Sequence, residues 1–251
     1  MKYLLVPLQF TLILFSTICL LIAVLLILPF SRKIIHHPVR KMWTKAVIAA
    51  TGAKFNIYGQ NNLPQNLANT MILANHISWL DTIVLLRITF LRFIGKIEML
   101  KWPGLSSIIK AGDTIFIDRK NKRSIPEVNG QLANLLHNGA TIGLYPEGTT
   151  GHGRTIMPFK PAFLEAPLMA NSFLVPVVIS YRKENDKLAT EVTFNKVGWI
   201  TTVINTLKIT NLVINVTILP PVASSSFNTR EELSNHLFEQ MNACYTAQQT
   251  R

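Results

Sequence analysis

Cysteine is scarce in this chain, whose 251 residues include only Cys19 and Cys244. The two lie far apart, so neither takes part in the short spacings that are typical of zinc sites and dithiol redox centres. Cysteine-based metal binding and redox chemistry are therefore excluded, and we expect the protein to work in a reducing compartment.

Acidic residues are also few. The chain has 13 Asp and Glu against 25 Lys and Arg, a net charge of +12, and no acidic residue precedes Asp81. Such a surplus suits nucleic acid, anionic lipid or a phosphorylated substrate. The basic run at 119–123 is short, and no recognisable nucleic-acid-binding motif accompanies it, so we do not expect a nucleic-acid partner.

Charge of either sign is missing between Tyr3 and Phe30, where Leu, Ile, Val and Phe predominate. A helix over the run 8–28 would be roughly 31 Å long at about 1.5 Å per residue, which matches a hydrocarbon core of about 30 Å. A cleaved signal peptide has a shorter apolar core and ends at a small-residue site, whereas Pro29-Phe30-Ser31-Arg32 follows here. We therefore expect a retained membrane anchor over 1–31.

Basic residues follow the anchor. The segment 34–53 has apolar residues at three- and four-residue spacings, which predicts an amphipathic helix that packs on the anchor or lies at the membrane interface. The nearby cations favour the cytoplasmic side and would attract anionic lipid, at about 1 kcal/mol per side chain. They are Arg32, Lys33, Arg40, Lys41, Lys45 and Lys54. We assign 32–60 to this interfacial segment, and 61–251 to a globular domain on the cytoplasmic face of the inner membrane.

Short apolar runs alternate with helical patterns after the loop at 59–64, which predicts an α/β domain with a mostly parallel sheet flanked by helices. Strands are expected at 70–74, 91–95, 114–117, 141–145, 174–180 and 212–219. Helices are expected at 80–87, 105–110, 125–137, 161–170 and 230–245. Two of them begin with capping boxes, Ser124-x-x-Glu127 and Thr229-x-x-Glu232. The stretch 198–211 is hydrophobic but weakly patterned, and it receives no assignment.

Three polar clusters fall at or just past the ends of predicted strands, where parallel α/β sheets form their sites. The first holds His76 and, five residues later, Asp81. A carboxylate that accepts a hydrogen bond from one ring nitrogen would leave the other free to take a proton from a hydroxyl. Taken alone, such a histidine is more often structural than catalytic, but the later clusters favour a general base and its orienting acid.

The chain offers this base no obvious nucleophile. It has no Gly-x-Ser-x-Gly elbow, and the cysteines are badly placed. The simplest solution is that the substrate supplies the hydroxyl, which means transfer to an alcohol without an acyl-enzyme. Ser78 is the one nearby candidate for a covalent route, as in a membrane serine esterase.

The other clusters suggest an anionic ligand. Arg119 follows a predicted strand, and a guanidinium binds phosphate with two parallel hydrogen bonds. The turn Pro146–Gly151 follows another, and its glycines allow backbone N–H groups to approach an anion. Glu147 would repel a phosphate, so we expect it to orient Arg119 or a substrate hydroxyl.

Four blocks of the sequence resemble those of the glycerophospholipid acyltransferase family, especially its lysophosphatidic acid acyltransferases. They occur in the family's order within the predicted domain, and the resemblance implies that 61–251 is an acyltransferase catalytic domain. The blocks are Asn75-His76-Ile77-Ser78-Trp79-Leu80-Asp81, Gly112-Asp113-Thr114-Ile115-Phe116-Ile117-Asp118-Arg119, Tyr145-Pro146-Glu147-Gly148-Thr149 and Val175-Pro176-Val177.

The resemblance implies a role for each block. His76 and Asp81 match the catalytic pair. The fourth block would lie on the acyl-donor side, with Val175 and Pro176. The acceptor would be bound by residues of the second and third blocks and by a lysine that precedes them: Arg119, Glu147, Gly148, Thr149 and Lys96.

The resemblance thus implies an O-acyltransferase that moves a fatty acyl group from acyl-CoA or acyl-carrier protein to the sn-2 hydroxyl of lysophosphatidic acid, giving phosphatidic acid. We expect no metal and no cofactor. Thr149-Thr150-Gly151 stands where Thr-Arg-Ser is common, and 146–162 resembles the branch that acylates lyso-ornithine lipids. A lyso-ornithine lipid or other lysolipid is therefore the alternative acceptor, and an inert lipid-binding protein is an alternative of another class.

Overall fold

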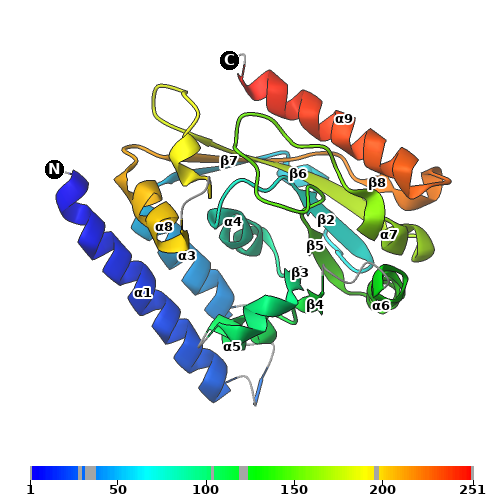
Figure 1. The fold of residues 1–251 in the computed structure, drawn as a ribbon, viewed down its shortest axis with the longest axis horizontal. Coiled ribbons are helices and arrows are strands. Elements are labelled where there is room, and N and C mark those ends of the chain that lie inside the picture. The colour runs from blue at the N-terminus through cyan, green and yellow to red at the C-terminus, as the bar shows by residue number, and fades with distance from the viewer. Residues whose placement is uncertain are drawn as a thin grey trace.

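The computed structural model describes residues 2–27, 30–31, 38–102, 105–118, 124–194 and 198–249. These residues form an eight-stranded sheet in the order β1-β7-β6-β2-β5-β3-β4, with β8 beside β6 (Figure 1). The strands are β1 (Lys54–Tyr58), β2 (Thr70–Ala74), β3 (Arg92–Lys96), β4 (Ile115–Ile117), β5 (Thr141–Leu144), β6 (Phe173–Arg182), β7 (Val213–Ile218) and β8 (Val222–Ala223).

The pairing of the strands confirms the predicted α/β fold with a mostly parallel sheet. β2 pairs in parallel with β5 and β6, and β3 does so with β4 and β5. β1 and β7 are parallel to each other. β6 pairs in the antiparallel sense with β7 and with β8, so the sheet is mixed at this end.

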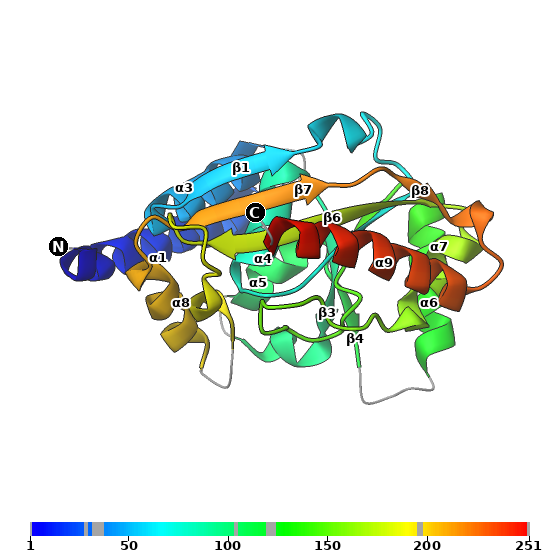
Figure 2. The same cartoon turned by 90° about the horizontal axis from the view of Figure 1, so that it is seen from above.

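Helices cover both faces of the sheet (Figures 1 and 2). The central strand β2 is buried along its whole length, as its unbroken apolar sequence predicts. Met71 and Leu73 belong to the core cluster that contains residues of α6, while Ile72 and Ala74 belong to the cluster that contains residues of α4. The helices are α1 (Lys2–Ile27), α3 (Arg40–Thr51), α4 (Leu80–Ile88), α5 (Leu105–Ala111), α6 (Ile125–His137), α7 (Glu165–Met169), α8 (Trp199–Lys208) and α9 (Arg230–Gln249).

Pro176 lies in the middle of β6, where a proline would normally remove a ladder hydrogen bond. The backbone oxygen of Pro176 accepts from the N–H of Leu219, so this residue faces the β7 side of the strand. The pairing with β8 stops at Leu174, and that with β7 starts at Val177. The proline therefore occupies the gap between the two partners, where its missing N–H costs no ladder bond.

The sheet begins earlier than the sequence suggested. The segment 32–60 was assigned to the membrane interface, but β1 (Lys54–Tyr58) pairs with β7 and belongs to the sheet. The helix predicted at 34–53 ends two residues earlier than predicted, since α3 ends at Thr51 and Gly52 follows with a left-handed φ of 67°. The residues at 32–37, including Arg32 and Lys33, lie outside the described residues.

The unassigned stretch 198–211 contains α8. Its β-branched residues have weak helix propensity, which obscured the pattern in the sequence. Tertiary packing stabilises it instead, because Val203 and Leu207 are buried in the core.

One of the two predicted capping boxes has its side-chain hydrogen bond. The hydroxyl of Thr229 accepts from the N–H of Glu232 at 3.2 Å at the start of α9, as predicted. The side chain of Ser124 makes no cap hydrogen bond at the start of α6.

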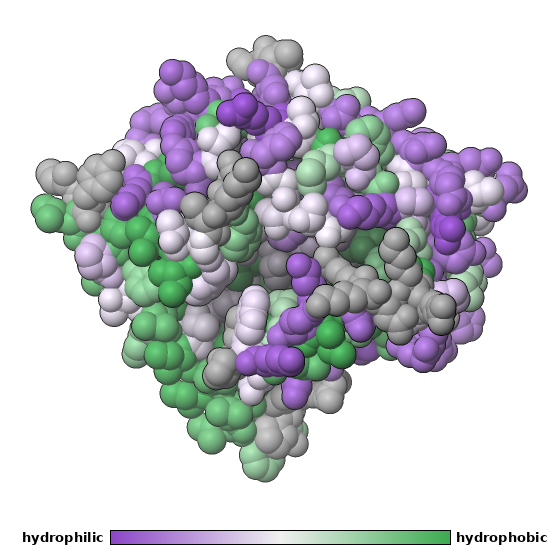
Figure 3. Space-filling model, in the orientation of Figure 1, coloured by the Kyte–Doolittle hydropathy of each residue, from purple (hydrophilic) through white to green (hydrophobic). Residues whose placement is uncertain are grey.

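The first helix carries the most apolar surface of the described residues. The stretch Leu4–Ile27 is long and apolar enough to cross a membrane, with mean hydropathy 2.9. α1 packs on α3, α5 and α8 through a stripe of buried residues, Val6, Ile13, Leu20 and Val24. Its other side is apolar and exposed, and hydrophobic surface gathers where α1 lies (Figure 3).

Candidate active site

The bend after β2 places His76 at the carboxyl end of the sheet. The side-chain amide of Asn75 donates to the carbonyl of Ile179 at 2.9 Å and accepts from its N–H at 2.8 Å. The Asn75 side chain thus bonds both backbone polar groups of Ile179 in β6, as a neighbouring strand would. The main chain can therefore leave the sheet after Ala74. α4 then begins at Leu80, and its first turn carries Asp81.

His76 and Asp81 are in direct contact, as their spacing predicts. Nδ1 of His76 lies 2.8 Å from Oδ2 of Asp81. An ionised carboxylate only accepts, so Nδ1 carries the proton and Nε2 is the basic nitrogen. The imidazole side chain is 22% exposed, whereas Asp81 is fully buried. His76 is therefore oriented from within the protein and open on its reactive side.

Asp81 accepts three further hydrogen bonds. The backbone N–H groups of Ile77 and Ser78 donate to Oδ2 at 2.6 Å and 2.8 Å. The phenol of Tyr181 donates to Oδ1 at 2.6 Å. Burial, together with the nearby Asp81, raises the pKa of Tyr181 well above its usual range, so this phenol keeps its proton. A buried carboxylate with both oxygens occupied is held in one position.

The sequence analysis does not identify Tyr181, because the predicted strand ends one residue before it and it lies 100 residues from Asp81. Tyr145, which the resemblance gives only as the first residue of the third block, also belongs to the site. The ring of Tyr145 stacks on that of His76, with centroids 4.2 Å apart and planes 14° apart. The Tyr145 hydroxyl lies 3.2 Å from Oγ1 of Thr82 in α4. The aromatic face thus fixes the plane of the imidazole.

Glu147 has different partners from those expected. Its carboxylate is buried, with Oε1 accepting from the N–H of His76 at 2.7 Å and Oε2 from that of Met157 at 3.1 Å. Burial raises the pKa of Glu147 to about 7, while these two hydrogen bonds act in the opposite direction. In this structure the Glu147 carboxylate therefore supports the loop that carries His76.

Gly151 also bonds the backbone of His76. Its N–H donates to the carbonyl of His76 at 2.7 Å. A methyl group added at Gly151 would lie 3.1 Å from Oε2 of Glu147, so a larger residue here would displace this carboxylate. The turn after β5 therefore holds both backbone polar groups of His76.

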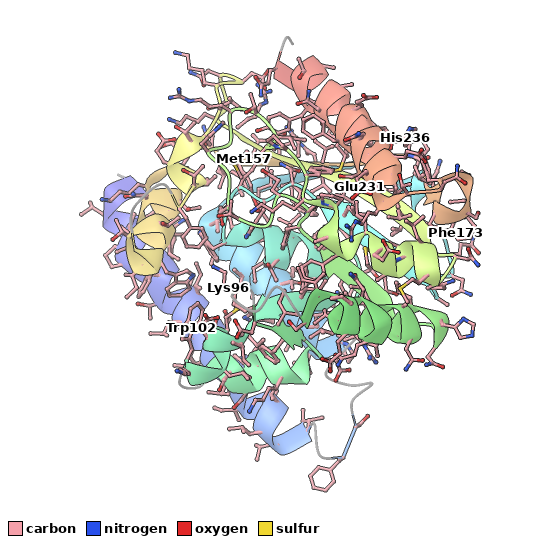
Figure 4. The ribbon with its side chains drawn as sticks, turned by 45° about the vertical axis from the view of Figure 1, so that its right-hand side comes forward. Lys96, Trp102, Met157, Phe173, Glu231 and His236 are labelled. Carbon is pink, nitrogen blue, oxygen red and sulfur yellow. The ribbon has the colours of Figure 1, made fainter. Side chains whose placement is uncertain are left out.

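Of the remaining predicted site residues, Lys96 and Thr149 lie at this end of the sheet, whereas Val175 and Pro176 do not. Lys96 is exposed at the end of β3, and Figure 4 shows it below the loop that carries Met157. Thr149 is exposed in the turn after β5. Val175 and Pro176 are buried inside β6, beside Ile72 and Leu73. Arg119, the predicted phosphate ligand, lies outside the described residues.

Ser78 is a poor candidate for a nucleophile in this structure. It is fully buried, and its hydroxyl oxygen accepts from the N–H of Leu80 at 3.3 Å. Its bonding is that of a residue at a helix start, which does not favour the serine esterase alternative. Among the described residues, no cluster of three or more His, Cys, Asp or Glu side chains is placed to hold a metal ion.

Comparisons with known proteins find similarity to acyltransferases. The sequence profile of the Acyltransferase family matches residues 54–180. A 1-acyl-sn-glycerol-3-phosphate acyltransferase of Neisseria gonorrhoeae is 26% identical over 180 residues, which are 72% of this chain and 71% of that protein. A lyso-ornithine lipid O-acyltransferase of Pseudomonas aeruginosa is 34% identical over 111 residues, 44% of this chain and 43% of that protein.

A solved structure shares the whole fold. The 1-acyl-sn-glycerophosphate (LPA) acyltransferase PlsC of Thermotoga maritima superposes with a TM-score of 0.74 over 100% of this chain and 95% of its own. The two sequences are 21% identical, so this likeness concerns the fold.

Proposed function

The chain belongs to the Acyltransferase family, and we propose that it esterifies the sn-2 hydroxyl of lysophosphatidic acid with a fatty acyl group to give phosphatidic acid. The observation that carries this proposal is the pairing of His76 with Asp81 at 2.8 Å beside a buried Ser78. A basic nitrogen without a protein nucleophile suits an acceptor that brings its own hydroxyl.

The proposed reaction is a direct transfer. Nε2 of His76 takes the proton of the sn-2 hydroxyl while the hydroxyl oxygen attacks the thioester carbonyl of acyl-CoA or acyl-carrier protein. The carbon–sulfur bond then breaks, and the imidazolium returns the proton to the departing thiolate. Asp81 stabilises the imidazolium in between, and Tyr145 keeps the ring in plane. The products are phosphatidic acid and the free thiol of the carrier.

The acceptor headgroup would lie over the loops at the carboxyl ends of β3, β4 and β5. We propose that Lys96, Arg119 and the turn Gly148–Thr149 bind it there, with Glu147 acting through the His76 backbone. Val175 and Pro176 are buried, so they would act on the acyl-donor side by placing β6 and not by contact.

The membrane would supply the lipid directly. α1 exposes apolar side chains, and Trp102 and Trp199 are about half exposed on the neighbouring segments. Tryptophans are typical of the membrane interface. We propose a cytoplasmic-membrane protein whose α1 side lies at lipid depth, with the basic segment after α1 toward anionic headgroups.

Acyl transfer by the purified full-length protein to a panel of lysolipids tests the acceptor. We expect lysophosphatidic acid to be acylated fastest, with acyl-CoA and acyl-carrier protein compared as donors. The alternative acceptor is supported by the likeness to the Pseudomonas aeruginosa lyso-ornithine lipid O-acyltransferase. Faster acylation of lyso-ornithine lipid than of lysophosphatidic acid would contradict our assignment.

A further inference from the structure

The turn after β5 carries no cation of its own, since the sequence from Tyr145 to Gly151 contains none. A cation reaches it from a later segment. The N–H of Lys160 donates to the carbonyl of Pro146 at 2.8 Å, which brings the returning chain beside the turn. A methyl group added at Gly148 would lie 3.1 Å from Cδ and 3.3 Å from Nζ of Lys160. The lysine side chain therefore lies directly over Gly148.

The backbone of Lys160 is held on both sides. Phe159 packs against Phe238 of α9 edge to face, with ring centroids 5.4 Å apart. On the other side a short 3-10 helix begins at Pro161, and the carbonyl of Ala162 accepts from the side chain of Asn129 at 2.8 Å. Lys160 itself is exposed. Because the backbone of Lys160 is held in place, its exposed ammonium loses less entropy when it binds an anion.

No acid among the described residues forms an ion pair with Lys160. The nearest candidate by sequence is Glu147, which precedes Gly148, but its two oxygens accept from the backbone of His76 and Met157. Gly148 has a φ of 70°, so the turn keeps a glycine and leaves the space above it to the lysine. The positive charge of Lys160 thus remains available to a ligand.

We propose that Lys160 binds the anionic phosphate headgroup of the lysolipid. This inference rests on the proposed function. A phosphate monoester carries between one and two negative charges at neutral pH, and a compact ammonium suits it as a point charge. Lys160 would be a further acceptor-binding residue beside the turn that holds His76.

Steady-state kinetics of Lys160→Met test this role, using the full-length protein, lysophosphatidic acid and an acyl-CoA. We expect the KM for lysophosphatidic acid to rise at least about tenfold, as for loss of a charge-assisted hydrogen bond. kcat and the KM for the donor should change less than about twofold. Lys160→Arg should restore most of the affinity. Lys187→Met is the matched control, because it removes one exposed lysine from a turn beyond β6.

The outcomes separate this inference from the function on which it rests. If the wild-type protein acylates lysophosphatidic acid and Lys160→Met keeps its KM, Lys160 has no such role and the proposed function stands. A similar rise in KM for Lys187→Met would reduce the effect to net charge and overturn the inference. Wild-type protein that acylates lyso-ornithine lipid alone would overturn both.

Discussion

At the scale of single residues, the site depends on how His76 is held. Asp81 fixes Nδ1, Tyr145 fixes the ring plane, and Glu147 and Gly151 fix the backbone. These polar groups are buried and hydrogen-bonded. Removing one partner leaves the other unsatisfied, which costs more free energy than the hydrogen bond contributes to stability. The reactive nitrogen is therefore pre-oriented before a substrate arrives.

His76→Ala should abolish acyl transfer, because it removes the base, while membrane association remains. Ser78→Ala is the matched variant: it should keep most of the activity, since the hydroxyl is buried and bonded only to the N–H of Leu80. Radiolabelled acyl transfer and membrane fractionation measure the two properties. An active His76→Ala variant, or an acyl-serine trapped on Ser78, would contradict the direct mechanism.

Tyr181→Phe should lower kcat by about tenfold, because Oδ1 of Asp81 then lies buried without its donor. Tyr58→Phe at an exposed position of β1 is the control. An unchanged kcat in Tyr181→Phe would show that this hydrogen bond does not position Asp81 for the reaction.

Glu147 makes stability depend on pH. Its pKa in the folded protein is about 7 against an ordinary 4.5, so the folded state binds this proton more tightly than the unfolded chain. The contribution is complete below about pH 4.5 and is lost as pH rises through about 7, at most about 3 kcal/mol. Denaturant unfolding in detergent from pH 4.5 to 8 should show this fall, and Glu147→Gln should flatten it. Equal pH slopes for the two proteins would exclude the effect.

At the scale of elements, the carboxyl-terminal helix α9 contacts the loop at 151–157. The hydroxyl of Tyr245 in α9 donates to the carbonyl of Gly153 at 2.8 Å, and both groups are buried. Gly153 precedes Met157, whose N–H bonds Glu147. α9 is thus connected to His76 through hydrogen bonds to the loop at 151–157 and to Glu147.

Tyr245→Phe should lower the free energy of unfolding by about 1 kcal/mol and speed hydrogen exchange at 151–157. kcat should fall several-fold, because the loop supports Glu147. Hydrogen exchange by mass spectrometry and steady-state assays measure these changes, again with Tyr58→Phe as the control. Unchanged exchange in the loop would mean that α9 does not hold it.

The local sequence pattern of each helix and strand explains whether it could be predicted from the sequence. The strands with continuous apolar runs and the helices with strong periodicity are found within a few residues of their predicted bounds. β1 was missed because its sequence, Lys54-Phe55-Asn56-Ile57-Tyr58, is half polar and its partner β7 lies more than 150 residues away. α8 was missed because packing, not propensity, makes it a helix.

At the scale of the whole molecule, the apolar side of α1 should decide where the protein works. Leu12 and Phe15 are 48% and 64% exposed on α1. Changing both to Lys places charge on that surface and should move the protein from the membrane to the soluble fraction in carbonate-washed extracts. Gln131→Lys with Asn134→Lys on α6 adds the same charge away from α1. Retention of the α1 variant in the membrane would exclude this surface as the anchor.

The sequence by itself determined the α/β class, the apolar helix at the start, and the pairing of His76 with Asp81. These depend on local spacing, since five residues across a strand-to-helix bend bring the two side chains together. Only the tertiary structure decided the rest of the site. It brought Tyr181 to Asp81 from a strand 100 residues away, turned Glu147 inward to the backbone of His76, and laid Lys160 over Gly148. Contacts between distant segments follow from packing, which no short pattern records.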